Sequence, residues 1–221
     1  MTQREVGEAW EHAIAASGLP VAMTEADRPR PRISFGAPLP VGVAAEGELI
    51  DVVLTDRLPA WQVREALTGQ LPAGWSISDI QDVWLAGPAL AGRVVAADYR
   101  IALSGEGGEL DPGALAGAAE RLLAARSLPR QRARGGGSVP YDLRPLVLDV
   151  ALADPGPPPT IRARTRFHAE LGTGRPEEVV GALGELCGRP LVAASIVRER
   201  LILAEDLDGP SDRGEGGLSR S

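Results

Sequence analysis

Hydrophobic residues recur along this chain with two periods, and each period predicts a different kind of element. A spacing of three to four residues places Val6, Trp10 and Ile14 on one side of a helix that ends at Gly18. Strict alternation, as over residues 94–103, is typical of strands with one buried face. The two patterns predict helices over residues 4–17, 59–71, 111–126 and 176–187, and strands or extended segments over residues 21–23, 32–35, 49–54, 75–85, 94–103, 146–152, 161–168 and 191–204.

The order of these elements predicts the fold. The second half gives strand, helix, strand, strand, helix, strand, which is the ferredoxin-like order, and the first half gives the same order without its opening strand. We therefore predict an α+β protein with two tandem ferredoxin-like halves, residues 1–86 and 94–204, in which helices cover one face of antiparallel sheets. The final segment is glycine-rich and holds five acids, which predicts a disordered acidic tail over residues 205–221.

The composition excludes several classes of protein. With 221 residues, 44% of them hydrophobic and 24% charged, the chain has the make-up of a soluble globular protein. A lone cysteine, Cys187, forms no internal disulfide and builds no zinc or iron–sulfur site, so we expect no bound metal or cofactor. The chain has no apolar run of membrane-spanning length, and its N-terminus is too polar for a signal peptide. We therefore expect a cytoplasmic protein that does not associate with a membrane.

The charge is unevenly distributed. A net charge of −7 argues against a protein that coats nucleic acid over its whole surface. Three segments are nevertheless basic: residues 28–43 and 160–168 each hold three arginines and no acid, and residues 121–146 hold six arginines against Asp142. A basic face on an acidic body is therefore expected.

Residues suited to catalysis are few. His12 lies beside two glutamates on a predicted helix, His168 follows three arginines on a predicted strand, and Cys187 lies near a helix end. The favoured interpretation is a solvated surface residue for His12 and His168, and a buried residue that fills space for Cys187. The glycine-rich stretches at residues 105–108, 135–138 and 172–174 lack the spacing of nucleotide-binding loops, and we interpret them as turns, with residues 135–138 a flexible loop.

The predicted strand at residues 161–168 carries the clearest functional pattern. Alternation projects Arg162, Arg164 and Arg166 from one face about 6.6 Å apart, which is near the spacing of phosphates in an extended single strand. The alternative is a solvated face whose arginines pair with acids of a neighbouring strand, for example Asp149. Further arginines around the glycines at 135–138 have the form of a loop that orders on an anionic partner.

Four sequence motifs resemble a known family. They are RISFGAPLPVGV at residues 32–43, EGELID at 46–51, YDLRPLV at 141–147 and TGRPEEV at 173–179. In this order they resemble the uncharacterised radical-SAM-linked protein family, also called DUF2344. The resemblance implies a bacterial protein encoded beside, or fused to, a radical SAM protein that often carries a cobalamin-binding domain, and it implies no established reaction.

The chain departs from the family pattern in two places. Members begin with a strand and a Ser-His segment that precede the first helix, and here these do not precede residue 4, so we expect the first half to lack its opening strand. Members also tend to have a Gly-Phe-Asn-Pro-His-Pro-Lys segment where this chain has ADRPRPR at residues 26–32, so an aromatic residue and a histidine are replaced by Asp27 and Arg30.

These observations predict a non-catalytic accessory protein that binds RNA or another anionic substrate for a radical SAM partner. The residues expected to bind this substrate are Arg28, Arg30, Arg32, Arg130, Arg132, Arg134, Tyr141, Arg144, Arg162, Arg164 and Arg166. One alternative is an RNA-modifying enzyme that resembles pseudouridine synthases, with Asp142 as the nucleophile, although a turn-capping role also explains that aspartate. A purely protein-binding module is the other alternative.

Overall fold

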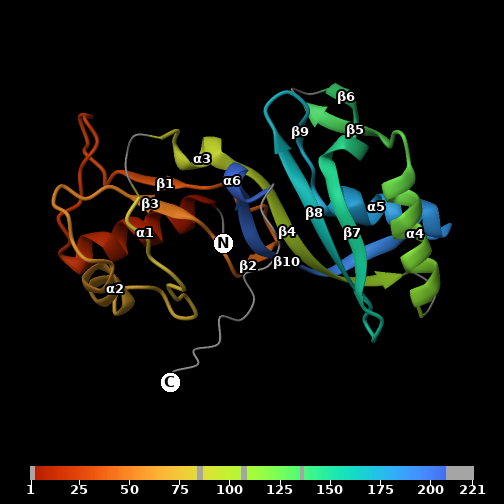
Figure 1. Cartoon of the computed structure of the whole chain (residues 1–221), viewed down its shortest axis with the longest axis horizontal. Coiled ribbons are helices and arrows are strands. Elements are labelled where there is room, and N and C mark those ends of the chain that lie inside the picture. The colour runs from red at the N-terminus through yellow and green to blue at the C-terminus, as the bar shows by residue number, and fades with distance from the viewer. Residues whose placement is uncertain (1–2, 84–86, 106–108, 135–136, 208–221) are drawn as a thin grey trace, which may run out of the picture. The chain divides into compact units, whose positions relative to one another are not determined.

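The computed structural model describes residues 3–83, 87–105, 109–134 and 137–207 (Figure 1). The chain divides into two units, residues 1–93 and 94–221. Each unit is described by itself below. Among the described residues, no helix has both the length and the apolar character needed to cross a bilayer.

The first unit combines helices with one small sheet. Helix α1 (Gln3–Ser17) ends at Gly18, whose positive φ of 69° suits glycine, and the ring of Trp10 on α1 lies 5.9 Å from that of Trp75. Strands β1 (Ile33–Phe35) and β3 (Ile50–Val52) pair antiparallel. The remaining elements of this unit are β2 (Ala44–Ala45), α2 (Ala60–Thr68) and α3 (Leu90–Arg93).

The prediction of a strand over residues 75–85 is wrong. Residues 75–83 form no strand, and residues 84 and 85 lie outside the described residues. The side chain of Arg64 on α2 donates to the carbonyl oxygens of Ile77 and Ser78, the second at 3.2 Å. These hydrogen bonds provide partners for backbone carbonyls of residues 77 and 78 without a neighbouring strand.

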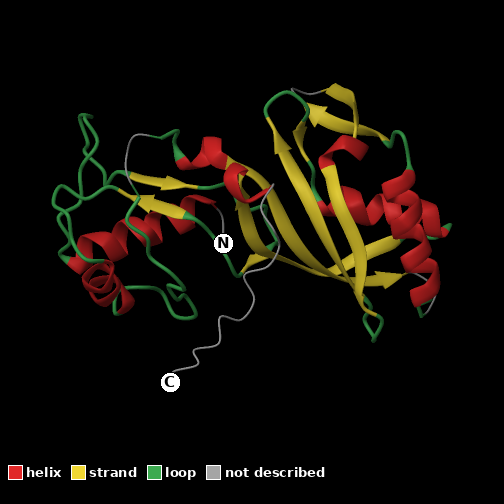
Figure 2. Cartoon of the chain, in the orientation of Figure 1, coloured by secondary structure: helices red, strands yellow, loops and turns green. Residues whose placement is uncertain are grey.

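The second unit is built on an antiparallel sheet with the strand order β10-β4-β8-β7 (Figure 2). Its strands are β4 (Val94–Gly105), β7 (Val147–Asp154), β8 (Thr160–His168) and β10 (Leu191–Leu203), and the short β9 (Gly172–Thr173) pairs with β8. Its helices are α4 (Pro112–Ala124), α5 (Pro176–Cys187), the 3-10 turn η1 (Arg144–Leu146) and the short α6 (Ala204–Leu207). The strands and long helices follow the order predicted for residues 94–204.

Local signals set the ends of both long helices. The Asp111 side chain accepts a hydrogen bond of 2.9 Å from the N–H of Gly113 and so caps α4. Helix α5 starts with Pro176 and ends at Gly188, which adopts the left-handed conformation with φ 70°.

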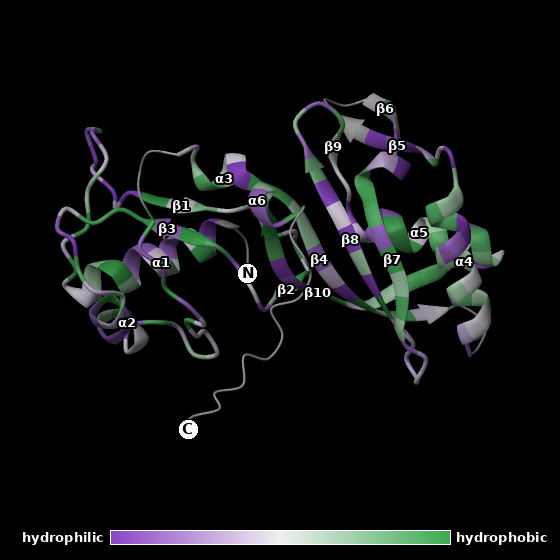
Figure 3. Cartoon of the chain, in the orientation of Figure 1, coloured by the Kyte–Doolittle hydropathy of each residue, from purple (hydrophilic) through white to green (hydrophobic). Residues whose placement is uncertain are grey.

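The core of the second unit lies between the sheet and the helices α4 and α5. Alternate residues of β4 and β8 point into it, and the hydropathy colouring of these strands alternates accordingly (Figure 3). The largest fully buried hydrophobic side chains are Tyr99, Ile101, Leu103, Leu115, Leu122, Leu143, Leu146, Ile161, Leu183, Val147 and Val179. Because one face of the sheet is packed in this way, the register of its strands is fixed.

A hairpin stands where the sequence predicts a flexible loop. Strands β5 (Pro129–Arg134) and β6 (Gly137–Asp142) pair antiparallel, while residues 135 and 136 lie outside the described residues. The strand β5 has the sequence PRQRAR and offers no apolar alternation to detect. Tertiary contacts of its arginines, described below, hold it instead.

The structure thus shows a mixed α+β chain, but not two tandem ferredoxin-like halves. In the first unit the described residues form the β1–β3 pairing, isolated bridges between Val21 and Leu54 and between Met23 and Pro31, the two-residue β2, and helices. These do not make up the ferredoxin-like arrangement that the prediction requires. The tail predicted over residues 205–221 begins inside α6, and its residues 208–221 lie outside the described residues.

Gly174 allows a close approach that a side chain would block. A Cβ at this position would lie 2.5 Å from the carbonyl oxygen of Leu146 and 3.0 Å from the Cβ of Thr165. We predict that Gly174→Ala lowers the free energy of unfolding by about 1–3 kcal/mol, because the backbone must shift to relieve the overlap. Chemical denaturation followed by circular dichroism measures this change.

Gly181→Ala on the exposed side of α5 is the matched control. A Cβ there meets nothing within 4 Å, so alanine should stabilise the helix by up to about 1 kcal/mol. Equal effects of the two substitutions would contradict the packing assigned to Gly174.

Candidate functional site

The predicted arginine row lies on one face of β8. Ile161, Ala163 and Thr165 are at most 2% exposed and point into the core, so Arg162, Arg164 and Arg166 project from the opposite side. Neighbouring strands add further charged residues to that side. We call it the outer face and define it by Asp98 and Arg100 of β4, Asp149 of β7, the three arginines of β8, and Glu199 and Arg200 of β10.

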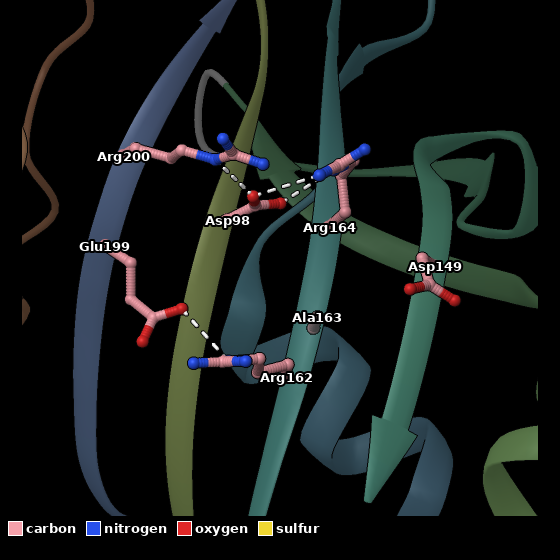
Figure 4. Close-up of a pocket in the computed structure, with 7 residues that line it drawn as sticks. All are labelled: Asp98, Asp149, Arg162, Ala163, Arg164, Glu199 and Arg200. Atoms are coloured by element: carbon pink, nitrogen blue, oxygen red, sulfur yellow. Dashed lines mark hydrogen bonds and ion pairs between the residues drawn. The ribbon is translucent and has the colours of Figure 1, made fainter. Parts of the chain in front are cut away.

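One row of charges alternates in sign across four strands. In the register of the sheet, Arg200 lies opposite Asp98, Asp98 opposite Arg164, and Arg164 opposite Asp149. The Asp98 carboxylate accepts hydrogen bonds from Nε and Nη2 of Arg164 at 2.7 and 3.1 Å, and from Nε of Arg200 at 2.7 Å (Figure 4). Asp98 therefore holds two guanidinium groups at once.

Glu199 plays the same part for a second pair of arginines. Arg100 and Arg162 lie directly opposite each other on β4 and β8, where like charges repel. Glu199 contacts both, at 3.0 Å from Nη1 of Arg100 and 3.3 Å from Nε of Arg162. A register shift between Arg198 and Arg200 leaves Glu199 without a Cα partner on β4.

Hydrogen bonding outweighs burial at Asp98. Burial by itself raises the pKa of a carboxyl, but the hydrogen bonds from Arg164 and Arg200 bring the pKa of Asp98 below its ordinary value. The pKa of Arg164 is raised, first by its hydrogen bond to Asp98 and further by the charges of Asp98 and Asp149. Both groups are therefore ionised throughout the physiological range.

The outer face is hollowed between these strands. A pocket of about 400 Å³ is lined by Asp98, Asp149, Arg162, Ala163, Arg164, Glu199 and Arg200 (Figure 4). Asp149 is exposed and makes no hydrogen bond or ion pair with any residue that the structure describes, in contrast to Asp98 and Glu199. The alternative interpretation of the sequence, in which these arginines pair with acids of other strands, describes Arg162 and Arg164, but their partners are Glu199 and Asp98 rather than the example Asp149.

The arginines of the hairpin bind elements of their own unit. Arg130 forms an ion pair of 3.0 Å with Glu185 on α5. Arg132 donates to the carbonyl oxygen of Thr173 at 2.7 Å, lies 3.6 Å from Glu178, and stacks 4.3 Å from the ring centre of Tyr141. Arg134 is the last residue of β5, opposite Gly137. Arg130 and Arg132 therefore attach the hairpin to α5 and β9. The sequence predicted instead that these arginines flank a flexible loop that becomes ordered on binding an anionic partner.

Tyr141 lies in the same cluster. Burial and the nearby carboxylate of Glu178 raise the pKa of Tyr141 to about 12. Its hydroxyl and the Nε of Arg132 are buried without a hydrogen-bond partner among the described residues. Tyr141 is thus a neutral residue that packs beneath Arg132.

Asp142 and Arg144 both hold backbone. The Asp142 carboxylate accepts hydrogen bonds from the N–H groups of Leu128 and Arg144 at 2.7 and 3.0 Å, which bring its pKa below the ordinary value although burial acts in the opposite direction. The Arg144 guanidinium donates to the carbonyl oxygens of Leu123, at the end of α4, and of Val147. These contacts match a turn-capping aspartate and a helix-capping arginine.

The proline-loop arginines belong to the first unit. Arg28, Arg30 and Arg32 are exposed, and Arg30 lies 3.6 Å from Glu11 on α1. The other predicted substrate-binding residues belong to the second unit. The described structure therefore brings together Arg162, Arg164 and Arg166 on one face, and separately Arg130, Arg132 and Tyr141 at the hairpin.

The structure places each of the residues considered for catalysis. Nδ1 of His168 accepts hydrogen bonds from the N–H groups of Glu170 and Leu171, both at 3.2 Å. Burial raises the pKa of the Cys187 thiol, which makes it a poor nucleophile, and His12 is exposed on α1. Within the described residues, no three histidine, cysteine, aspartate or glutamate side chains gather as metal ligands.

Comparison with known proteins identifies the family of this chain. The sequence pattern of a family described as an uncharacterized protein conserved in bacteria, DUF2344, matches residues 1–179. The chain belongs to the DUF2344 family. No curated protein matches it.

The motifs that resembled DUF2344 now have places in the structure. YDLRPLV runs from β6 through η1 into β7, and TGRPEEV runs from β9 into α5. These two motifs of the DUF2344 chain meet where Gly174 packs closely against the backbone of Leu146. The DUF2344 match includes Asp98, Asp149 and Arg164, and it ends before Glu199 and Arg200.

Sequence reasoning missed four members of the outer face: Asp98, Arg100, Glu199 and Arg200. The alternation in residues 94–103 does place Asp98 and Arg100 on the polar side of their strand. The pairing of β4 between β8 and β10 joins them to Arg162, Arg164 and Arg200, and this neighbourhood of strands has no local signal in the sequence.

Asp98→Asn tests the charge row in this DUF2344 protein. The folded pKa of Asp98 is depressed, so its ionised form stabilises the fold above the unfolded pKa of about 4, and this contribution is lost as the pH falls through the folded pKa. At neutral pH the variant should lose roughly 1–2 kcal/mol of stability, because two guanidinium groups lose a charged acceptor. Urea denaturation at several pH values measures both effects.

Glu120→Gln on the exposed side of α4 is the control and should change stability little. Below about pH 4 the wild type should lose stability more steeply than Asp98→Asn. Parallel pH profiles of the wild type and Asp98→Asn would contradict the ion pairs assigned to Asp98.

Proposed function

We propose that this chain is a non-catalytic accessory protein that binds an anionic substrate, RNA included, at the outer face of its second unit and acts with a radical SAM protein. The partner, with its frequent cobalamin-binding domain, rests on the motif resemblance alone. The binding role rests on the charges of the outer face. For this role we interpret the second unit as ferredoxin-like, since such a sheet has helices on one face and leaves the other for a ligand.

The proposal rests on one observation: Asp98 and Glu199 are each shared between two arginines. Asp98 holds Arg164 and Arg200, and Glu199 holds Arg100 and Arg162. The guanidinium groups are also fixed in position before any ligand arrives, which reduces the entropy lost on binding. An anion that meets this face finds ordered guanidinium donors, and the five arginines of the face outnumber its three acids by two.

The same pairing limits the size of the binding site. Arg130, Arg132 and Arg144 are engaged with carboxylates or carbonyl oxygens of their own unit. Arg166 of β8 has no ion-pair partner among the described residues, and its charge is balanced on this face by that of Asp149. We therefore propose a compact anion site rather than a long cradle made of all the predicted arginines.

A protein-binding module is the second candidate, and one observation favours it. The alternating row of Arg200, Asp98, Arg164 and Asp149 matches a partner surface of opposite alternation. No comparable observation favours an RNA-modifying enzyme, because the carboxylate named for that chemistry, Asp142, holds a turn.

The dependence of RNA affinity on salt concentration measures how many phosphate charges the outer face neutralises. For a single-stranded RNA oligonucleotide, log affinity should fall with log salt with a slope of about −1.4 for two net charges, at roughly 0.7 per phosphate. Participation of all ten predicted arginines would give about −7 on the same basis. Fluorescence anisotropy of a labelled oligonucleotide over a salt series gives the slope.

The double variant Arg164→Ala/Arg200→Ala should abolish this binding. Arg4→Ala/Arg57→Ala is the matched control, since both of these arginines are more than 80% exposed and each pairs with one carboxylate. Binding that ignores salt, or that falls equally in the two double variants, would refute the anion site on the outer face.

A further inference from the structure

The pocket of the outer face offers a carboxylate as well as guanidinium groups. We infer that its ligand is a compact zwitterionic group, with a phosphate or carboxylate bound by Arg164 and Arg200 and an adjacent ammonium bound by Asp149. This inference rests on the proposed anion site and names the chemical class of its ligand.

Asp149 supports the inference through its position and because it forms no hydrogen bond or ion pair with the described residues. It lies opposite Arg164 in the register of β7 and β8 and lines the same pocket. Unlike the other two acids of the pocket, it is exposed and makes no contact of hydrogen-bond or ion-pair length with the described part of the chain. Figure 4 shows its carboxylate on β7, across Arg164 from Asp98. A cation can therefore reach it without breaking an existing ion pair.

The other carboxylates are committed to arginines. Asp98 and Glu199 have side chains that are each 18% exposed, and both are held by two guanidinium groups. These two acids position the arginines, whereas Asp149 is left to contact a ligand. The pocket thus presents ordered donors for an anion and, one strand away, an acceptor for a cation.

A purely anionic ligand fits this arrangement less well. The negative charge of Asp149 repels a phosphate placed on Arg164, whereas an ammonium beside that phosphate converts the repulsion into attraction. The volume of about 400 Å³ lies in the range of small-molecule sites. A small zwitterion, or a larger molecule that carries such a group at one end, matches both the charges and the volume.

Two probes of equal size separate the two kinds of ligand. O-phosphoethanolamine carries an ammonium where n-propyl phosphate carries a methyl group, and the phosphate is the same in both. We expect the wild-type chain to bind phosphoethanolamine about 2- to 5-fold more tightly, the effect of one exposed ion pair. Isothermal titration calorimetry or NMR titration of the full chain measures both affinities.

The variant Asp149→Asn tests whether Asp149 is responsible for the preference for phosphoethanolamine over propyl phosphate. This variant should bring the affinity for phosphoethanolamine down to that for propyl phosphate, while propyl phosphate binds equally well or more tightly. Glu120→Gln, which removes an exposed carboxylate from α4, should keep the discrimination. Arg164→Ala/Arg200→Ala should lose both probes.

The possible outcomes separate the inference from the proposed function. Equal binding of the two probes by the wild type, or tighter binding of both by Asp149→Asn, overturns the zwitterionic ligand and leaves the anion site in place. Failure of both probes to bind in a manner that depends on Arg164 and Arg200 overturns the anion site and the inference together.

Discussion

Two carboxylates make the charged face of the second unit possible. Five arginines project from adjacent strands, and two of them, Arg100 and Arg162, lie directly opposite each other. Without Glu199 between them and Asp98 between Arg164 and Arg200, this face would carry like charges at the spacing of neighbouring strands. The acids therefore allow a cationic surface to exist on a stable sheet, and they also fix where each guanidinium points.

The elements of the second unit could be predicted from the sequence because their signals are local. Asp111 with Pro112 starts a helix, Gly188 ends one, and alternation marks the buried residues of β4 and β8. The prediction failed where tertiary contacts decide the backbone. Arg64 donates to the backbone carbonyls of residues 77 and 78, which form no strand, and Arg130 and Arg132 hold a hairpin in a segment without apolar alternation.

The candidate site was predictable only in part, for a related reason. The sequence places Arg162, Arg164 and Arg166 on one face, because alternation is a property of a single strand. Which strands lie beside β8, and therefore which acids meet these arginines, depends on long-range pairing. Asp149 was identified as the neighbouring acid, yet Asp98 and Glu199 form the ion pairs, since β4 contributes the facing carboxylate and β10 reaches across it.

The register shift in β10 has a consequence for how this face is encoded. Residues that follow each other in a regular strand point to opposite sides, yet Glu199 and Arg200 both line the pocket because the ladder is interrupted between Arg198 and Arg200. The charge pattern therefore depends on the number of residues in β10 as well as on their identity. Deleting Glu199 would restore a regular ladder, with Arg200 still opposite Asp98, but it would remove the carboxylate between Arg100 and Arg162 while leaving every arginine in the chain. A one-residue insertion in β10 is thus what supplies the counter-charge for two facing arginines.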